Sequence, residues 1–172
     1  MNEAEIRRFL DTDYPRLVNA MALVCGSFPA AEDAVQEALA RAWERSERGQ
    51  YIGSVAGWVA TVARNLLRDR FRRAMAEARA RRRLAARPEA PSGTAQVERR
   101  ADVERALAAL PRRQREVAVF RYFLDLDVTE IAGVLRVPEG TVKSALHRAR
   151  RSLAGALGED ADQLEVGDVG DR

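Results

Sequence analysis

The sequence has few of the residue types that most often carry chemistry. Cys25 is its single cysteine, so no internal disulfide can form and a reducing compartment is expected. His147 is its single histidine and Lys143 its single lysine, and aromatic residues make up only 6% of the chain. No stretch approaches the roughly 18 apolar residues that a membrane-spanning helix needs, and the N-terminus lacks a signal peptide. These absences exclude a disulfide scaffold and membrane insertion, and they favour a soluble, cytoplasmic protein.

Charge is abundant but unevenly distributed. Charged residues make up 32% of the chain, hydrophobic residues make up 47%, and the net charge is only +3. Residues 64–83 carry nine arginines against two carboxylates, Asp69 and Glu77, whereas residues 155–172 carry a net charge of −5. A basic middle between acidic ends indicates a polyanionic partner.

A helix-turn-helix pattern occupies residues 128–151. Thr129 is placed to cap a first short helix, and Pro138 ends that helical pattern because proline cannot continue a helix. A second helix follows with an apolar stripe at helical spacing: Val142, Ala145, Leu146, Ala149 and Leu153. Its other side is polar and basic: Lys143, Ser144, His147, Arg148, Arg150 and Arg151. A helix buried on one side with such a polar face suits the major groove of DNA.

The first half of the chain contains further amphipathic helices. Residues 3–26 form two helical pieces, with Pro15 in the first turn of the second, and Cys25 falls on their apolar side as a small core residue. The helix of residues 30–47 has an apolar stripe and a polar side that begins with Glu32, Asp33, Gln36 and Glu37. Composition alone favours an ordinary solvated face, whose acids complement the positive end of the helix.

A polar and basic strip follows in the next helix. Residues 49–53 form a loop, and Ser54 can cap the helix that begins at Val55. Arg64, Asn65 and Arg68 share one flank of that helix. Exposed arginine and asparagine side chains beside a loop that can receive unstacked bases are typical of single-strand nucleic-acid binding.

These patterns predict an all-α protein of two small helical domains joined by a flexible linker. The first domain spans residues 1–74, the linker residues 75–100 and the second domain residues 101–157. Proline, serine and glycine make the linker flexible around Pro88–Thr94. Residues 158–172 form an acidic tail that we expect to be disordered.

Three blocks of the sequence, in this order, resemble the sigma-70 family of bacterial RNA polymerase sigma factors. Residues 31–38 (AEDAVQEA) resemble region 2.2 of that family, and residues 58–69 (WVATVARNLLRD) resemble regions 2.3–2.4. Residues 110–117 (LPRRQREV), with the helix-turn-helix, are similar to region 4. Two domains with a short linker, without regions 1.1 and 3, resemble the extracytoplasmic-function (ECF) subgroup.

The resemblance implies a protein that binds core RNA polymerase, through the β′ clamp and the β subunit, and directs it to promoter DNA. It implies no catalytic residue, no cofactor and no metal, and it implies an anti-sigma factor as a further partner. The residues matching the polymerase-docking region are Glu32, Asp33, Gln36 and Glu37. Those matching the −10 reader are Tyr51, Ser54, Arg64, Asn65 and Arg68. Those matching the −35 reader are Gly140, Thr141, Lys143, Ser144, His147, Arg148 and Arg151.

Two other classes of function compete with this interpretation. An autonomous helix-turn-helix repressor that dimerises through residues 1–73 would bind paired half-sites about one helical turn apart. A hydrolase or nuclease would use Glu32, Asp33 and Glu37, but no histidine, cysteine or lysine lies nearby in the sequence to assist them. The repressor hypothesis gives the region 2-like residues no function. The hydrolase hypothesis lacks a general base, a nucleophile and metal ligands.

Overall fold

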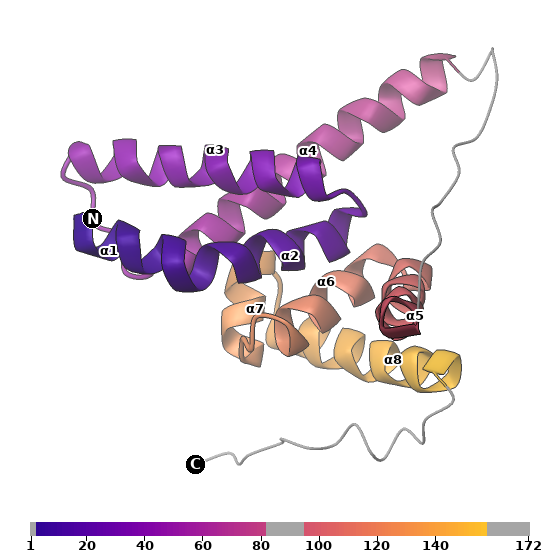
Figure 1. The fold of residues 1–172 in the computed structure, drawn as a ribbon. Coiled ribbons are helices and arrows are strands. Elements are labelled where there is room, and N and C mark those ends of the chain that lie inside the picture. Colours follow the sequence, from indigo (N-terminus) through magenta and orange to yellow (C-terminus); the bar gives the residue numbers. More distant parts are fainter. Residues whose placement is uncertain (1–2, 82–94, 158–172) are drawn as a thin grey trace, which may run out of the picture. The chain divides into compact units, whose positions relative to one another are not determined.

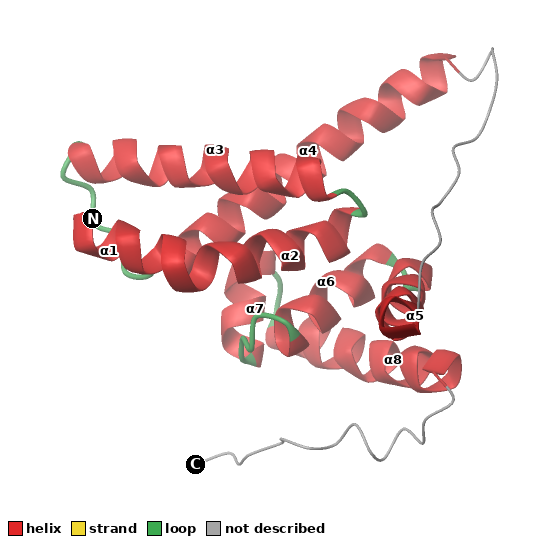
Figure 2. Ribbon diagram, viewed as in Figure 1, coloured by secondary structure: helices red, strands yellow, loops and turns green. Residues whose placement is uncertain are grey.

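The computed structural model describes residues 3–81 and 95–157, which are helical apart from short turns and loops (Figure 2). No strand occurs in these two stretches, so the expected all-α fold is confirmed. The chain divides into two compact units, Met1–Gly93 and Thr94–Arg172. The loop expected around Pro88–Thr94 and the acidic tail of residues 158–172 lie outside the described residues.

The first unit is a bundle of helices. It contains α1 (Glu3–Arg8), a π-helical turn η1 (Phe9–Asp13), α2 (Tyr14–Cys25), α3 (Phe28–Glu47) and α4 (Val55–Arg81). Figure 1 shows α3 running antiparallel to α2, with α4 crossing them. The three long helices pack against one another, and η1 packs against α2.

Local chemistry sets the helix boundaries in this unit. Gly26 ends α2 in the left-handed conformation (φ 76°), which glycine adopts without a Cβ clash. Ser27 then caps α3, because its hydroxyl oxygen accepts a hydrogen bond from the backbone nitrogen of Ala30 at 3.4 Å. Pro15 and Pro29 lie in the first turns of α2 and α3, where their missing N–H groups have no helical partner.

Alanines bring the helices of the first unit close together. Ala31, Ala34, Ala38 and Ala42 recur at helical spacing along α3 and are completely buried. Larger core residues come from the neighbouring elements: Phe9, Leu17, Val18, Met21, Val59 and Leu67. Burial of each such side chain contributes roughly 1.5–3 kcal/mol. This packing keeps the polar side of α3 on the surface of the unit.

Cys25 is not a core residue, so this prediction from the sequence is wrong. The residue lies at the C-terminus of α2 and is exposed, with its thiol donating to the backbone oxygen of Ser27 at 3.2 Å. The apolar register continued to Cys25 in the sequence, but the left-handed turn at Gly26 ends the packed helix there. Periodicity alone does not show where a helix leaves the core.

The second unit also consists of packed helices. It contains α5 (Ala95–Ala109), α6 (Arg112–Tyr122), α7 (Val128–Leu135) and α8 (Glu139–Leu157). Helix α8 packs against the other three, and α6 also packs against α7. The core includes Leu107, Leu110, Val117, Phe120, Ile131, Leu135, Val142, Leu146 and Ala149. Helix α5 begins earlier than the expected start near Ala101, and α4 continues beyond residue 74.

The first helix of the helix-turn-helix is capped by Asp127 and not by Thr129. The Asp127 carboxylate accepts from the backbone nitrogen of Glu130 at 2.7 Å, and the Glu130 carboxylate accepts from that of Asp127 at 2.8 Å. This reciprocal arrangement is a capping box. Thr129 lies inside α7 and donates its hydroxyl to Glu139 at 2.9 Å, which ties α7 to the start of α8.

The turn between α7 and α8 depends on a left-handed residue. Arg136 ends α7 with φ 54° and ψ 55°, and its backbone nitrogen donates to the carbonyl oxygens of Ala132 and Gly133. Pro138 follows and starts a new direction for the chain, because α8 begins at Glu139. The expected helix-turn-helix is therefore present.

Within the described residues, no helix is long and apolar enough to cross a membrane. The same residues contain no group of three histidine, cysteine or carboxylate side chains placed to hold a metal ion.

Candidate nucleic-acid interface and the acidic face of α3

The polar side of α3 carries four side chains over its first half. Glu32, Asp33, Gln36 and Glu37 are interleaved with the buried residues Ala31, Ala34, Val35 and Ala38. Asp33 and Gln36 are exposed, and Glu32 and Glu37 are half-buried. The sequence therefore placed all four on the accessible side of one helix.

Both carboxylate oxygens of Glu37 are already engaged within the first unit. Oε2 accepts from Nη2 of Arg70 on α4 at 3.0 Å, and Oε1 accepts from Nη2 of Arg41 at 2.5 Å. The carboxylate therefore lies between two guanidinium groups. The Glu37 carboxylate thus joins α3 to α4 through Arg70. Because both of its oxygens accept from arginines, it is not placed as a general base.

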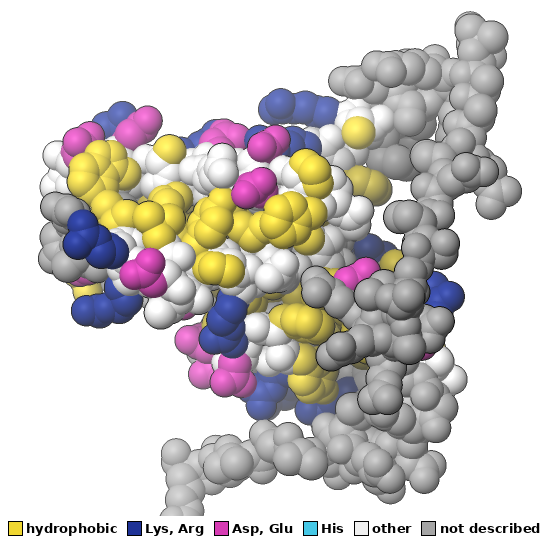
Figure 3. All heavy atoms as spheres, in the orientation of Figure 1, with side chains coloured by type: hydrophobic (Ala, Val, Ile, Leu, Met, Phe, Trp, Pro, Cys, Tyr) yellow, Lys and Arg dark blue, Asp and Glu magenta, His cyan; other side chains and the backbone are white. Residues whose placement is uncertain are grey.

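Apolar side chains accompany this polar face. Leu10, Phe28 and Trp43 keep 43%, 51% and 40% of their surface exposed. Figure 3 shows hydrophobic side chains gathered in a band over α2 and α3, with acidic and basic side chains beside it. Gln36 also donates to the Tyr14 hydroxyl at 3.2 Å, which links α3 to α2.

The loop before α4 presents an aromatic ring to solvent. Tyr51 is 87% exposed, the most exposed large hydrophobic residue in the described part of the chain. Ser54 ends the loop, and its hydroxyl oxygen accepts from the backbone nitrogen of Gly57 at 3.1 Å. Ser54 therefore caps α4 as expected, and this bond uses part of its hydrogen-bonding capacity.

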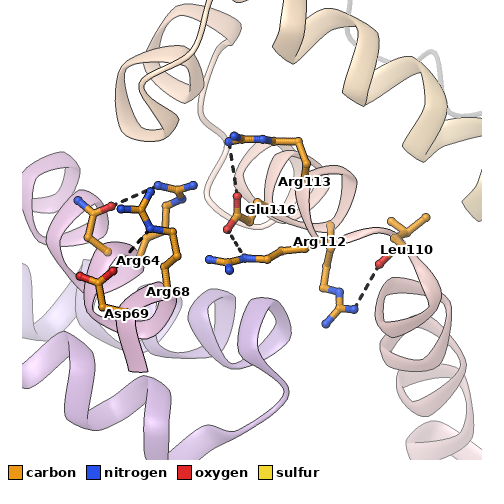
Figure 4. A network of polar contacts seen from close by, with 9 residues as sticks. Arg64, Arg68, Asp69, Leu110, Arg112, Arg113 and Glu116 are labelled. Carbon is orange, nitrogen blue, oxygen red and sulfur yellow. Dashed lines mark hydrogen bonds and ion pairs between the residues drawn. The ribbon is translucent and has the colours of Figure 1, made fainter. Parts of the chain in front are cut away.

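The basic strip on α4 is less exposed than the sequence indicated. Arg64 is buried, and Asn65 and Arg68 are half-buried. The Asn65 side-chain oxygen accepts from Nη1 of Arg64 at 3.3 Å, and Nε of Arg68 lies 3.8 Å from the Asp69 carboxylate (Figure 4). Internal contacts thus orient these side chains, and only part of the strip is open to a ligand.

Helix α8 presents its polar residues on the side opposite its core stripe. All seven residues expected to contact DNA are exposed: Gly140, Thr141, Lys143, Ser144, His147, Arg148 and Arg151. The apolar stripe of Val142, Ala145, Leu146, Ala149 and Leu153 is buried, as predicted. The Ser144 hydroxyl donates to the backbone oxygen of Gly140 at 2.8 Å, so Lys143 is the less restricted donor of the two.

The arginines at the start of α6 have an internal role. Glu116 accepts from Nε of Arg112 at 3.0 Å and lies 3.7 Å from Nη1 of Arg113 (Figure 4). Arg115 donates to the backbone oxygens of Ala108 and Leu110 at 2.6 and 3.3 Å, which satisfies carbonyls at the end of α5. These side chains organise the connection between α5 and α6.

Two residues at these surfaces were missed by the sequence reasoning. Arg70 reaches Glu37 across 33 positions, and the Tyr122 hydroxyl accepts from Nε of Arg150 at 2.8 Å across 28 positions. Neither pair belongs to a local motif, so only helix packing brings the partners together.

Comparisons with known proteins match both units. The family model described as Sigma-70 region 2 matches residues 9–77, and the one described as Sigma-70, region 4 matches residues 100–153. The chain is 35% identical over 169 residues to the ECF RNA polymerase sigma factor SigL of Mycobacterium tuberculosis, covering 91% of this chain and 92% of SigL. The chain belongs to the ECF sigma factors.

Other relatives are consistent with this family. This ECF sigma factor is 38% identical over 136 residues to SigM of Mycobacterium tuberculosis, with 74% of the chain and 64% of SigM covered. The chain thus spans less than two thirds of SigM. Among solved structures, it resembles the sigma factor RpoE of Bartonella quintana in complex with the anti-sigma factor NepR, with a TM-score of 0.74 and 25% identity. That similarity covers 90% of this chain and 98% of RpoE.

Proposed function

We propose that this ECF sigma factor binds core RNA polymerase and directs it to promoters through −10 and −35 elements. The observation that carries the proposal is the sidedness of α8. Its polar residues are exposed, its apolar stripe is buried on the opposite side, and the preceding helix α7 is capped by Asp127. Such a helix presents donors to base edges in the major groove. The family supplies the expectation that a second DNA surface and a polymerase-docking surface lie on the other unit.

The acidic face of α3 is the proposed polymerase-docking surface. Glu32, Asp33 and Gln36 offer carboxylates and an amide to the clamp of the β′ subunit, and the exposed ring of Trp43 adds apolar area. Glu37 has a double role in this proposal, since its carboxylate also accepts from Arg70 and Arg41. The second unit would contact the β subunit.

The Tyr51 loop and α4 form the proposed −10 surface. Tyr51 offers an exposed ring on which an unstacked base can stack, and Ser54 stands at the start of α4. Arg64, Asn65 and Arg68 supply the neighbouring polar groups, partly oriented by contacts within the unit. Stacking and backbone contacts of this kind offset the free energy that unpairing costs.

The exposed face of α8 is the proposed −35 surface. It comprises Gly140, Thr141, Lys143, Ser144, His147, Arg148 and Arg151. Each base-edge contact from lysine or arginine contributes about 1–3 kcal/mol of discrimination. Since polymerase holds both units on one promoter, the effective concentration of the second surface is high, and α8 needs little affinity of its own.

The proposal extends to organisation and partners. The first domain is assigned to residues 1–74, the linker to residues 75–100 and the second domain to residues 101–157. The protein acts in the cytoplasm, has no active site of its own and leaves phosphodiester synthesis to polymerase. An anti-sigma factor is its expected regulator, and the solved RpoE structure in complex with NepR supports that expectation.

Run-off transcription tests the proposal. Purified chain and core polymerase are incubated with a promoter selected from random DNA, and specific initiation is expected only with both proteins. A chain that never associates with core polymerase contradicts the proposal. A palindromic footprint formed without polymerase would instead support an autonomous dimeric repressor.

A further inference from the structure

The exposed face of α8 carries positive charge that its own helix does not balance. Its exposed cations are Lys143, Arg148 and Arg151. The only carboxylate of α8 is at its first residue, Glu139, and that side chain accepts from Thr129 on α7. Within residues 95–157, no ion pair engages the three cations. A face of this kind favours an anionic partner.

The carboxylates that α8 lacks follow it directly in the sequence. The acidic tail of residues 158–172 carries a net charge of −5, from one arginine and six carboxylates: Glu159, Asp160, Asp162, Glu165, Asp168 and Asp171. The tail and the basic face of α8 thus have opposite charge and are joined in one chain. Charge complementarity makes the tail a candidate partner for its own helix.

The end of α8 offers these carboxylates no favourable partner. The C-terminus of a helix has a partial negative charge, which repels acids close to the last turn. The last turn of α8 contains no basic residue, and Glu159 and Asp160 come directly after it. The nearest preceding exposed cations are Arg151 and Arg148, about two helical turns before Leu157. Favourable pairing therefore requires the tail to turn back along the helix.

The tail is long enough to make this turn. From Leu157 to Lys143 the helix measures about 21 Å, at about 1.5 Å per residue. An extended chain covers about 3.3 Å per residue, so about seven tail residues span the same distance. The first carboxylates of the tail can reach Arg151 and Arg148, and those from Glu165 onward can reach Lys143.

The tail is a weaker polyanion than DNA. Its last four carboxylates recur at every third position from Asp162 to Asp171, about 10 Å apart in an extended chain. Double-stranded DNA carries one negative charge per about 1.7 Å. A short tether, however, gives a linked segment an effective concentration in the millimolar range. The tail can therefore compete with loosely bound DNA but not with a promoter that polymerase holds through both units.

We propose that the acidic tail folds back onto the exposed basic face of α8 and competes there with non-promoter DNA. The inference rests on the proposed promoter-binding function of α8 and adds an internal regulator to it. The free protein is kept from DNA that carries no promoter, and promoter DNA displaces the tail in the polymerase complex. The contact is electrostatic, so it weakens as salt shortens the Debye length from about 30 Å at 0.01 M to about 8 Å at 0.15 M.

Affinity for a short non-promoter duplex, measured by fluorescence anisotropy without polymerase, tests the competition. Three carboxylates of the tail are neutralised together in the full chain: Glu159→Gln, Asp160→Asn and Asp162→Asn. This tail variant is expected to bind the duplex about three- to tenfold more tightly at low salt, the size expected from two or three exposed ion pairs. The gain should shrink as salt rises to about 0.15 M.

The matched control changes the net charge by the same amount outside the tail. It neutralises three exposed carboxylates that do not belong to α8: Asp11→Asn, Glu47→Gln and Asp125→Asn. The control is expected to bind the duplex much as the wild type does. Equal gains for the tail variant and the control would assign the effect to net charge and overturn the inference. An unchanged affinity of the tail variant would overturn it as well.

A spin label tests whether the tail contacts α8. Cys25 is the single cysteine and is exposed, so Cys25→Ser combined with Val169→Cys leaves one attachment site, in the tail. The label is expected to broaden the amide resonances of Lys143 and Arg148 more than those of α3 and α4. Neutralising the three carboxylates should relieve this broadening. Broadening of α4 in place of α8, or broadening that the neutralised tail retains, would overturn the inference.

Promoter-directed transcription separates this inference from the proposed function. With core polymerase and a selected promoter, the tail variant is expected to initiate at the wild-type level, because polymerase holds both DNA-binding units on one promoter. If promoter initiation rises as much as non-promoter binding does, the tail does not discriminate between them and the inference is overturned. If the wild-type chain does not initiate, the proposed function fails, and the label measurement, which uses no DNA, still decides the tail contact.

Discussion

Arg70 on α4 donates to Glu37 on α3 at 3.0 Å, so a residue of the proposed docking surface also joins two helices of the bundle. The Arg70 and Glu37 side chains are each about 40% exposed. An exposed ion pair stabilises a fold by only about 0–1 kcal/mol. If a Glu37 substitution weakens polymerase binding by much more than about 1 kcal/mol, loss of this ion pair alone does not account for the change.

Glu37→Gln is expected to lower affinity for core polymerase more than Arg70→Gln does. Arg70→Gln breaks the same bridge but leaves the carboxylate in place, so it isolates the structural contribution. Glu44→Gln is the matched control, because Glu44 lies on the same helix and pairs with Arg48 at 3.6 Å. Equal losses for the Glu37 and Arg70 variants would show that Glu37 acts only as a bridge.

Arg136→Gly is expected to raise the free energy of unfolding of the second unit. Arg136 has φ 54°, and a left-handed conformation costs a residue with a Cβ about 1–2 kcal/mol. Glycine adopts it freely but loses more chain entropy on folding, so a net gain of about 0.5–1 kcal/mol is expected. Urea unfolding measures it, and Arg136→Ala, which keeps the Cβ, should give no gain. A gain of equal size with alanine would contradict the conformational explanation.

Asp127→Ala is expected to lower the free energy of unfolding of the second unit by about 1 kcal/mol, the usual contribution of an N-cap side chain. The substitution removes the carboxylate that accepts from the Glu130 backbone nitrogen at 2.7 Å. Asp127→Ser keeps a capping oxygen and should restore most of the loss in thermal unfolding. If serine fails to restore it while alanine destabilises, the carboxylate has a role beyond capping.

Lys143→Ala is expected to weaken promoter binding by the polymerase complex about tenfold or more through the −35 element, since one base-edge contact contributes about 1–3 kcal/mol. Ser144→Ala should cost less, because the Ser144 hydroxyl already donates to the Gly140 backbone oxygen at 2.8 Å. Run-off transcription with single base-pair changes in the −35 element is the measurement. An equal loss at every base pair would assign Lys143 to the backbone and not to a base.

Helical periodicity predicted much of the architecture. The stripe from Val142 to Leu153 is buried, and the seven exposed residues of α8 fall on the opposite side, because a rotation of about 100° per residue follows directly from helix geometry. Pro15 likewise predicted the start of a helix, and it lies in the first turn of α2. The polar face of α3 was also visible, since its small apolar residues recur at helical spacing.

Local patterns failed where several candidates competed for one role. Threonine and aspartate side chains can both cap a helix. Asp127 and not Thr129 caps α7, because the carboxylate of Glu130 reaches back to the Asp127 backbone nitrogen. Arg64 shares a helix face with Arg68 but is buried, so a shared face did not mean shared exposure.

By itself, then, the sequence determined the helical fold class, the turn at Pro138, and which faces of α3 and α8 are buried and which are exposed. These features depend on residues within one or two helical turns of each other. Tertiary structure decided which polar groups remain available. It paired Glu37 with Arg70 and Arg150 with Tyr122, and it exposed Cys25. Those outcomes depend on how helices distant in sequence cross, and the crossing is set by packing of the whole core.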